Sequence, residues 1–584
     1  MDKTTIEEKE QLKKIIAEEK ENETKKDGYT LPPDYIAKNN HLYKIIEKQK
    51  GDEIEITEVL ICRQVPIITK SFTNAEYAQL YHEITWLDNG KQYSEIVTAG
   101  ALATKNQLIQ LAEKSLAVND NNAKHLIKYF DTLNMYNHSK HEVLYDRIGH
   151  ISGKLLHPLI ENGATIRPIE SGEKQLLDAF KVNGSTDKWI EDVFNLIKVH
   201  PKALIMVLAS FSSPLLKDLR VDPYIVDLAG STSKGKTTVL KVCASVWGTG
   251  HLVNEWNLTK VAVERKAEFL NSFPLILDDS RKAEKKIVNS IVYQFSSGRG
   301  KGRGSLQGSQ REATWNNVML STGETTLTAN DENKGGVAAR IIELSGVPFN
   351  DIEFDFFEEV YDGIEENYGA IGLAFIQKWN EEKEIHLPKF KAFSKQLQRM
   401  AQGNEVVARI ARNYASIVFT ADLMNNFFNT DICLDNLIEM FAEIVEDNKA
   451  IDKPKQLMEV MLQELDADRR SIYYGKFEDG VPLKAVYRNG SLHLFPKFLK
   501  DFLGVEEKAI RGEWLNRKMV VPYENRGKKV DYHAIKVDGN KFNTVTLEKK
   551  IVRELGFDFS RNENENGFED IDVKAKQTGF VIGQ

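Results

Sequence analysis

One eight-residue stretch restricts the fold of this chain more than any other feature. It reads Gly-Ser-Thr-Ser-Lys-Gly-Lys-Thr over residues 230–237 and fits the pattern G-x-x-x-x-G-K-[ST]. The apolar run 224–229 before it predicts a buried parallel strand, and the segment 237–246 after it predicts a helix. Glycines let successive backbone N–H groups point at an anion, and a helix N-terminus adds partial positive charge. This combination predicts a phosphate-binding loop within an α/β domain and disfavours the alternative of a chance glycine-rich turn.

The residues of this phosphate loop predict a site for ATP and Mg²⁺. Lys236 is expected to reach the β- and γ-phosphates, and the hydroxyl of Thr237 is expected to bind Mg²⁺. The other predicted nucleotide-binding residues line the same turn: Gly230, Ser231, Thr232, Ser233, Lys234, Gly235 and Thr238.

Composition narrows the class of protein around this loop. The chain has 584 residues, the length of about four domains. Its three cysteines, Cys62, Cys243 and Cys433, lack metal-binding spacing, which predicts a reducing cytoplasm without a disulfide framework or zinc site. The longest apolar stretch, 203–216, is broken by serines and a proline and predicts a buried helix, with no membrane span. Because the formal charge is −8, any DNA binding must come from local basic patches.

Changes in pattern along the chain predict five segments. Alternating runs at 42–47 and 54–61 predict strands, and periodic runs at 107–116 and 122–133 predict helices, in a region without a chemical signature. Helical periodicity is strongest later, for example over 364–381 and 404–428. The predicted division is a charged arm that forms a frayed helix or is disordered (1–27), an α+β accessory domain (28–165), an α/β nucleotide-binding core (166–350), a helical lid region (351–470) and a C-terminal domain with an acidic tail (471–584).

A second motif, 274–279, is an apolar run that ends in two carboxylates. Such a strand is the expected companion of a phosphate loop, and the spacing of 42 residues from Lys236 (278 − 236) leaves room for intervening elements. Asp278 is expected to hold Mg²⁺ through water, and Asp279 to orient and polarise the attacking water. An apolar strand with two terminal acids also occurs as an ordinary structural element, so the functional interpretation depends on the loop upstream.

A third apolar run, 317–320, precedes Ser321 and Thr322. ATPases with an additional strand place such a strand between those of the first two motifs and end it with a polar residue that touches the γ-phosphate. Ser321 or Thr322 is expected to do so here, although Asn is the usual residue. Further on, Arg340 precedes the apolar run 341–344 and is a candidate to stabilise transition-state charge in a neighbouring subunit. The alternative for Arg340 is a surface salt bridge.

The segment 297–304, Ser-Gly-Arg-Gly-Lys-Gly-Arg-Gly, is a flexible cationic stretch without acids. We call it the cationic segment. Its charges, Arg299, Lys301 and Arg303, suit contact with a phosphodiester backbone without sequence reading. A disordered surface linker is the alternative. The position just before the third strand favours a DNA-binding loop, because hexameric helicases place a pore hairpin there.

These motifs, together with Leu258-Thr259 and the stretch 315–324, resemble one family. The chain is similar, over about 150–545, to the self-loading replicative helicases of staphylococcal cassette chromosomes and pathogenicity islands. These form a branch of AAA+ similar to the minichromosome-maintenance helicases. The resemblance implies an AAA+ core with a helical lid, ATP hydrolysis, a hexameric ring around single-stranded DNA, and duplex unwinding at the origin of a mobile genetic element. Many relatives carry Glu where this chain has Asp279, and the shorter side chain is compatible with slow turnover.

The C-terminal region has the pattern of a winged helix. A hairpin is expected over 485–494 around an Asn-Gly turn, followed by helices at 496–503 and 506–518. A second hairpin is expected between 520–523 and 532–537. Arg511, Arg517 and Lys518 would lie on the candidate DNA-recognition helix, whereas the nearby Glu506, Glu507 and Glu513 favour the alternative of protein docking.

Together, the motifs predict a cytoplasmic, ring-forming ATP-dependent DNA helicase. A nucleotide-switched origin-binding initiator and a protein-remodelling ATPase are the alternatives. The helical region offers Arg409 or Arg412 as a second sensor of nucleotide, or as ordinary solvated arginines.

Overall fold

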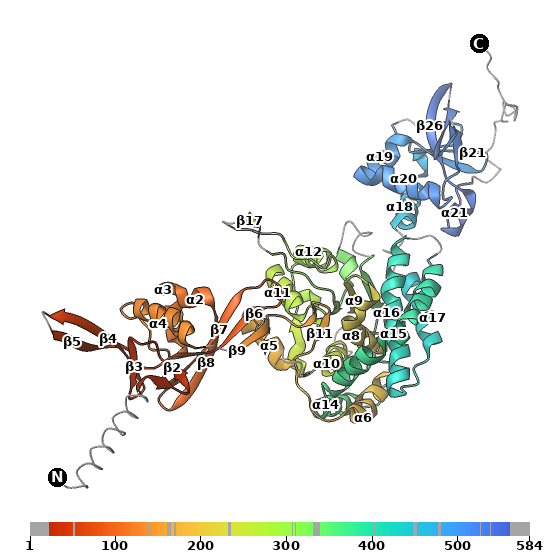
Figure 1. Ribbon diagram of the computed structural model, residues 1–584. Helices are drawn as coiled ribbons and strands as arrows, with labels where there is room; N and C mark the ends of the chain where they lie inside the picture. Colours follow the sequence, from red (N-terminus) through yellow and green to blue (C-terminus); the bar gives the residue numbers. More distant parts are fainter. Residues whose placement is uncertain are drawn as a thin grey trace, which may run out of the picture. The chain divides into compact units, whose positions relative to one another are not determined.

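The computed structural model divides into two compact units. The first comprises Met1–Asp331 and Arg340–Ile444, and the second comprises Glu332–Ala339 and Val445–Gln584 (Figure 1). The structure describes residues 23–50, 53–137, 140–160, 165–168, 171–231, 235–305, 308–309, 311–330, 339–401, 405–447, 453–476, 480–525, 527–537 and 539–560. Most of the predicted charged arm, 1–27, lies outside these residues, although Lys25–Lys26 forms strand β1 and pairs with β2 (Tyr29–Thr30). Among the described helices, none is long and apolar enough to cross a membrane.

The N-terminal region of the first unit has two larger sheets, the first antiparallel and the second mixed, together with a few helices. Strands β3 (Tyr35–Lys38), β4 (His41–Lys50) and β5 (Glu53–Cys62) form one sheet. The other has the order β12 (Thr165–Ile166), β9 (Lys140–Tyr145), β6 (Ile67–Asn74), β7 (Leu80–Asp88) and β8 (Lys91–Thr98). The predicted strands at 42–47 and 54–61 are confirmed as the β4–β5 pair.

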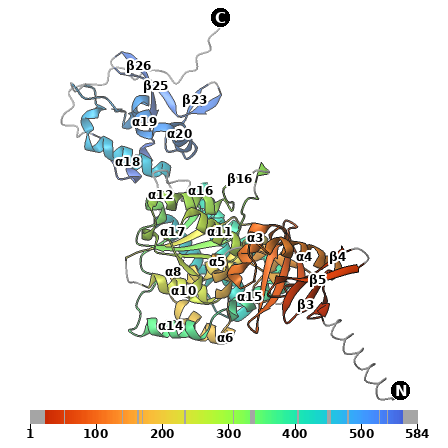
Figure 2. The same ribbon diagram turned by 90° about the vertical axis from the view of Figure 1, so that its left-hand side faces the viewer.

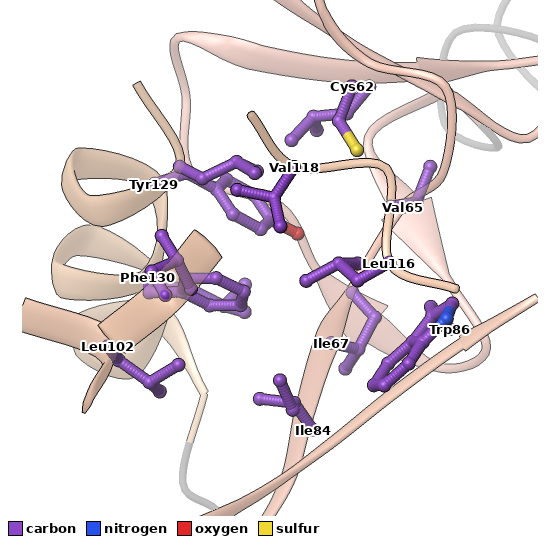
Figure 3. Close-up of a cluster of buried hydrophobic side chains, with 14 of the residues drawn as sticks. Cys62, Val65, Ile67, Ile84, Trp86, Leu102, Leu116, Val118, Tyr129 and Phe130 are labelled. Carbon is purple, nitrogen blue, oxygen red and sulfur yellow. The ribbon is translucent and has the colours of Figure 1, made fainter. Parts of the chain in front are cut away.

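One hydrophobic core joins these sheets to helices α2 (Ala99–Ala103), α3 (Lys105–Ile109) and α4 (Ala123–Tyr136). Figure 3 shows Trp86, Leu102, Tyr129 and Phe130 converging in it, and all four are buried. The predicted helix at 122–133 is confirmed as α4. The one predicted over 107–116 is divided between α3 and a 3-10 turn, Gln110–Lys114, that ends at Ser115 in a left-handed conformation.

A five-stranded parallel sheet forms the centre of the first unit. Its order is β14 (Val253–Glu255), β15 (Leu275–Asp278), β18 (Val318–Gly323), β13 (Tyr224–Ala229) and β19 (Ile341–Ser345). All neighbouring pairs are parallel. The strand that follows the acid pair in sequence, β18, therefore lies between the strands of the first two motifs, as predicted. All six residues of β13 are buried, which explains its unbroken apolar sequence.

Helices from segments far apart in the sequence cover this sheet. Helix α8 (Pro201–Ser212) packs on α10 (Lys236–Ser245), whereas α11 (Lys260–Leu270) packs on α12 (Lys285–Ser296) (Figure 1). Residues 203–212 of α8 are all buried, which confirms the predicted buried helix.

The helical region contains α14 (Phe356–Glu366), α15 (Ala370–Arg399), α16 (Glu405–Phe428) and α17 (Leu434–Asp447). The predicted helix at 404–428 is confirmed as α16. The prediction of one helix over 364–381 is wrong, because Gly369 adopts a φ of +76° and its N–H donates to the carbonyl of Ser245 instead of continuing a helix. The boundary between the two compact units falls within α17, at 444/445, where sequence pattern placed a boundary at 470/471.

The second unit has a five-stranded sheet and four helices among its described residues. The sheet order is β20 (Ile472–Tyr473), β21 (Ala485–Arg488), β22 (Ser491–Leu494), β26 (Asn540–Thr546) and β25 (Tyr532–Val537). The helices are α18 (Lys453–Ala467), α19 (Pro496–Leu503), α20 (Glu507–Asn516) and α21 (Lys549–Glu554). Four side chains of α18 are fully buried in this core: Met458, Met461, Leu462 and Leu465. The helix therefore belongs to this unit.

The first predicted hairpin is confirmed, and the second is wrong. Strands β21 and β22 pair across Asn489 and Gly490, both in left-handed conformations as such a turn needs. Instead of pairing with 520–523, β25 pairs with β26, whose last three residues are buried. A separate small hairpin joins β23 (Tyr523–Asn525) to β24 (Lys528–Val530).

Acid is expected to destabilise the second unit through His493. This side chain is 8% exposed, and its burial lowers its pKa from 6.5 to about 4. Between these values the unfolded chain binds more protons than the folded one, so the free energy of unfolding falls as the pH drops from 6.5 towards 4. The largest possible loss is roughly 3 kcal/mol. Urea titrations at pH 7 and pH 5, followed by pulsed hydrogen exchange in peptides from 485–547, would measure the part of this loss that occurs above pH 5, roughly 2 kcal/mol. His493→Gln should flatten this dependence, and an equal dependence in both proteins would contradict the assignment.

Candidate nucleotide site

The phosphate loop begins at the C-terminal edge of the parallel sheet, between its neighbouring strands. The N–H of Gly230 donates to the carbonyl of Gly323 on β18 (3.1 Å), and the carbonyl of Ala229 accepts from Gly346 after β19 (2.7 Å). Gly235 ends the loop with a φ of +88°, and a Cβ there would lie 2.6 Å from the ring of Phe349. Only glycine fits that position without strain. Thr232, Ser233 and Lys234 lie outside the described residues.

Lys236 is the first residue of α10, and its ammonium group turns back over the loop. Its Nζ donates to the carbonyls of Gly230 and Ser231, each at 2.8 Å. Burial lowers the pKa of Lys236, and the nearby carboxylates of Glu324, Asp278 and Asp279 oppose that shift. The side chain of Thr238, another residue predicted at this site, is 3% exposed, and its hydroxyl hydrogen-bonds that of Tyr361 on α14 (3.0 Å).

Asp278 brings the three motifs together. Its carboxylate accepts one hydrogen bond from the hydroxyl of Thr237 on α10 (2.8 Å) and another from that of Thr322 on β18 (2.5 Å). The residues come from neighbouring strands and the following helix, so the sheet order itself creates this contact. Carboxylate and hydroxyl oxygens are suitable ligands for a hard cation such as Mg²⁺.

Asp279 lies beside this cluster and is ion-paired. It follows the last residue of β15 with a φ of +61°, and its N–H donates to the Thr322 hydroxyl (3.2 Å). Its carboxylate accepts from Arg281 at 3.0 and 3.3 Å, and this contact holds the pKa of Asp279 below its ordinary value. Arg281 also pairs with Glu324, 2.7 Å away. Sequence reasoning missed both Arg281 and Glu324, although each lies within three residues of a motif.

The two predicted sensor residues separate in the structure. Thr322 reaches the carboxylates, whereas the hydroxyl of Ser321 accepts from the indole N–H of Trp256 (3.1 Å). Ser321 also faces Asp227, a fully buried carboxyl group whose pKa burial raises to about 7. Because alternate residues of a strand point to opposite faces, only Thr322 shares the face of Asp278.

Arg340 stands immediately before β19. Its guanidinium lies over the ring of Tyr293 on α12, 5.2 Å from the ring centre, and its carbonyl accepts from the N–H of Ile225 (3.0 Å). Of the two candidate second sensors, Arg409 is exposed on α16, and Arg412 donates to the carbonyl of Arg220 (2.8 Å).

The cationic segment forms the first of the two extended arms of a hairpin, which we call its legs. Gly300 donates to the carbonyl of Ala313 (2.8 Å), and Arg299 forms a β-bridge with Thr314. Beyond them, β16 (Gly304–Ser305) pairs with β17 (Gly308–Ser309), and this tip extends away from α11 and α12 in Figures 1 and 2. Arg299 and Lys301 are exposed, whereas Arg303 is half-buried and pairs with Glu264 of α11 (3.0 Å).

The basic residues predicted on the recognition helix are largely engaged within the second unit. Arg511 pairs with Asp531 (2.6 Å) and Glu507 (2.7 Å), and Arg517 pairs with Glu513 (3.2 Å). Helix α20 ends at Asn516, so Arg517 and Lys518 follow the helix instead of lying on it. Lys518 is exposed and has a φ of +56°.

Comparison with known proteins gives a fold relationship. The chain matches the family described as a domain of unknown function, DUF927, over residues 35–315. No curated protein matches it. A solved structure, SCCmec type IV Cch, described as an active helicase, aligns with a TM-score of 0.68 and 15% identity, over 90% of this chain and 99% of that one. The two chains share a fold. The apo C-terminal region of NrS-1 aligns with a TM-score of 0.24 and 10% identity, over 51% of this chain and 64% of that one.

This likeness spans both compact units, since it covers nine-tenths of the chain. It supports, at the level of the fold, the predicted resemblance to a helicase of staphylococcal cassette chromosomes. The match to this family ends at residue 315, before β18 begins, so it does not include Thr322 or Arg340.

Proposed function

We propose that this protein is an ATP-driven DNA helicase with an AAA+ core and a C-terminal winged helix. The observation that carries the proposal is the contact of Asp278 with Thr237 and Thr322, at the edge of a parallel sheet in which β18 separates β13 from β15. Nucleoside triphosphate hydrolysis needs a phosphate cradle, a cation-binding carboxylate and a polar sensor at one point, and the residue types that meet here suit these three tasks.

Within that site each side chain has a distinct task. Lys236 would exchange its two loop carbonyls for the β- and γ-phosphates of ATP. Thr237 and Asp278 would hold Mg²⁺, which supplies charge neutralisation between the phosphates. Asp279 would orient the attacking water, once Arg281 is drawn from it towards Glu324 or the phosphates.

The ring and the DNA contact complete the proposal. Arg340, as an arginine finger, would approach the γ-phosphate of a neighbouring subunit, and six such contacts would close a hexamer around single-stranded DNA. Arg299 and Lys301 would contact the backbone of that strand, because both are exposed on the hairpin leg. The residues 297–304 contain no aromatic side chain, which disfavours a pore that grips unfolded protein.

A strand-displacement assay tests this function. The wild-type protein is expected to separate forked duplexes with 3′ or 5′ tails in repeated turnovers, with ATPase activity stimulated by single-stranded DNA. Binding without separation would support an origin-binding initiator, and stimulation by unfolded protein would support a remodelling ATPase. Light scattering in the presence of ATP and DNA would measure the assembly.

Removal of the two exposed charges of the cationic segment should weaken DNA binding. For Arg299→Ala/Lys301→Ala, the slope of log Kd against log salt for an oligo-dT strand should fall by about 1.4, since each phosphate contact contributes about 0.7 on single strands. Fluorescence anisotropy at several salt concentrations would measure it. Lys286→Ala on α12, which removes another exposed charge, is the matched control. An unchanged slope in the double variant would exclude these residues from the DNA contact.

A further inference from the structure

Helix α11 presents two carboxylates towards the hairpin. Glu264 and Glu268 are four residues apart, so they share one face of the helix. Glu264 is 3% exposed as a residue and Glu268 has a side chain only 14% exposed. A carboxylate at this depth needs opposite charges or hydrogen-bond donors near it.

Glu264 holds the first leg of the hairpin. Its Oε1 lies 3.0 Å from a guanidinium nitrogen of Arg303, and its Oε2 accepts from Gln294 of α12 (2.8 Å). The backbone at Gly300 passes so close that a Cβ there would lie 2.7 Å from Oε1. Arg303 therefore points at the body of the protein, with its side chain 35% exposed.

Glu268 holds the second leg. Its Oε1 lies 2.8 Å from Arg311, whose guanidinium also lies 5.4 Å from the ring centre of Tyr77 in the N-terminal region. The same leg is bound by Arg147, which donates to the carbonyl of Thr314 (2.6 Å) and pairs with Glu76. The hairpin is thus anchored at the ends of both legs, which leaves the tip as its unanchored part among the described contacts.

The anchoring helix also belongs to the core that carries the nucleotide site. Helix α11 packs on β15, the strand that ends at Asp278. The legs are joined to each other by the hydrogen bond from Gly300 to Ala313. A displacement of α11 would therefore move both legs together.

We propose that Glu264 and Glu268 are positioning residues that couple the DNA-binding hairpin to the nucleotide site through α11. Arg303 and Arg311 are then anchors of the hairpin, and Arg299 and Lys301 are its DNA ligands. The N-terminal region, which carries no chemical motif, contributes Arg147 and Glu76 as a second clamp on the same hairpin. This inference rests on the proposed function, because it assigns parts to its DNA contact.

A double-mutant cycle of Glu264→Gln and Arg303→Gln tests the assignment. In each single variant, the stimulation of ATPase activity by oligo-dT should be at least about 5-fold weaker than in the wild type. The double variant should show a loss of similar size, because the effects of two residues that act as a pair are not additive. Arg303→Gln should leave the Kd for oligo-dT within about 2-fold, with an unchanged salt slope. A slope reduced by about 0.7 in Arg303→Gln would make Arg303 a DNA ligand and overturn the assignment.

A DNA-free measurement separates this inference from the proposed function. Hydrogen exchange in peptides covering 298–316 should be at least about 10-fold faster in Glu264→Gln than in the wild type, because the Gly300–Ala313 bond loses its support. Glu268→Gln, at a less buried position, provides the same test if Glu264→Gln does not fold. Unchanged exchange in a folded variant would refute the anchor, whatever the DNA assays give. Absence of DNA stimulation in the wild type, with exchange as expected, would instead refute the helicase proposal alone.

Discussion

The Lys236→Ala variant is expected to lose ATP hydrolysis by about 100-fold or more, because loss of a single charge-stabilising donor costs about 10²–10³ in kcat. Among the described contacts, its ammonium group donates to the loop carbonyls of Gly230 and Ser231, each at 2.8 Å, and both acceptors lie within six residues of it. The fold should therefore persist, with the melting temperature changed by no more than a few degrees. Steady-state phosphate release and nucleotide titration by fluorescence would measure kcat and affinity.

Two controls make this result specific. Lys286→Ala removes an exposed lysine from α12 of the same unit and should retain full hydrolysis. Strand displacement should disappear in Lys236→Ala together with hydrolysis, since translocation depends on it. Hydrolysis within 3-fold of the wild type would show that the phosphate loop does not bind the reacting nucleotide.

The Asp278→Asn variant is expected to show the second large loss, also about 100-fold in kcat. The amide has the size of the carboxylate and can keep one hydroxyl contact, so the sheet edge should stay intact. It lacks the negative charge that a hard cation needs, and half-maximal activity should require a higher Mg²⁺ concentration. Titration of ATPase activity with Mg²⁺ would measure both effects.

Asp279→Asn distinguishes the two acids. This variant should also hydrolyse slowly, because the group that orients water is altered, yet its Mg²⁺ dependence should match that of the wild type. The structure motivates the distinction, because Asp278 bonds Thr237 and Thr322, whereas Asp279 bonds Arg281. Equal shifts in Mg²⁺ dependence for both variants would contradict separate roles.

Local patterns predicted the elements of the nucleotide site well. The strands at 224–229 and 274–278, the helix after the loop and most of the buried helix predicted at 203–216 follow from apolar runs and their length, although α8 ends at Ser212 and a 3-10 turn follows it. The position of β18 between β13 and β15 was also foreseen, because strand order is tied to the motif set. The assignment of chemical roles to Lys236, Asp278 and Arg340 stays a prediction.

In two other regions the sequence pattern alone did not predict the secondary structure correctly. The hairpin between 520–523 and 532–537 was misassigned, because strand 540–546 alternates weakly in sequence and is buried only over its last three residues. The long helix expected at 364–381 is interrupted because Gly369 bonds across to the end of α10, at Ser245. Both errors concern residues whose partners are distant in sequence.

The sequence by itself determined where the candidate phosphate loop and the acid pair lie, since each is a contiguous stretch that its own residue types mark. Tertiary structure decided which charges meet. Arg281 pairs with Glu324, and Arg303 with Glu264, across about 40 residues of chain each. Such pairs depend on how helices and strands pack, which no local pattern contains. For that reason the sequence of the cationic segment predicted a DNA contact for all three of its charges. Only the fold showed that one of them, Arg303, is turned towards α11.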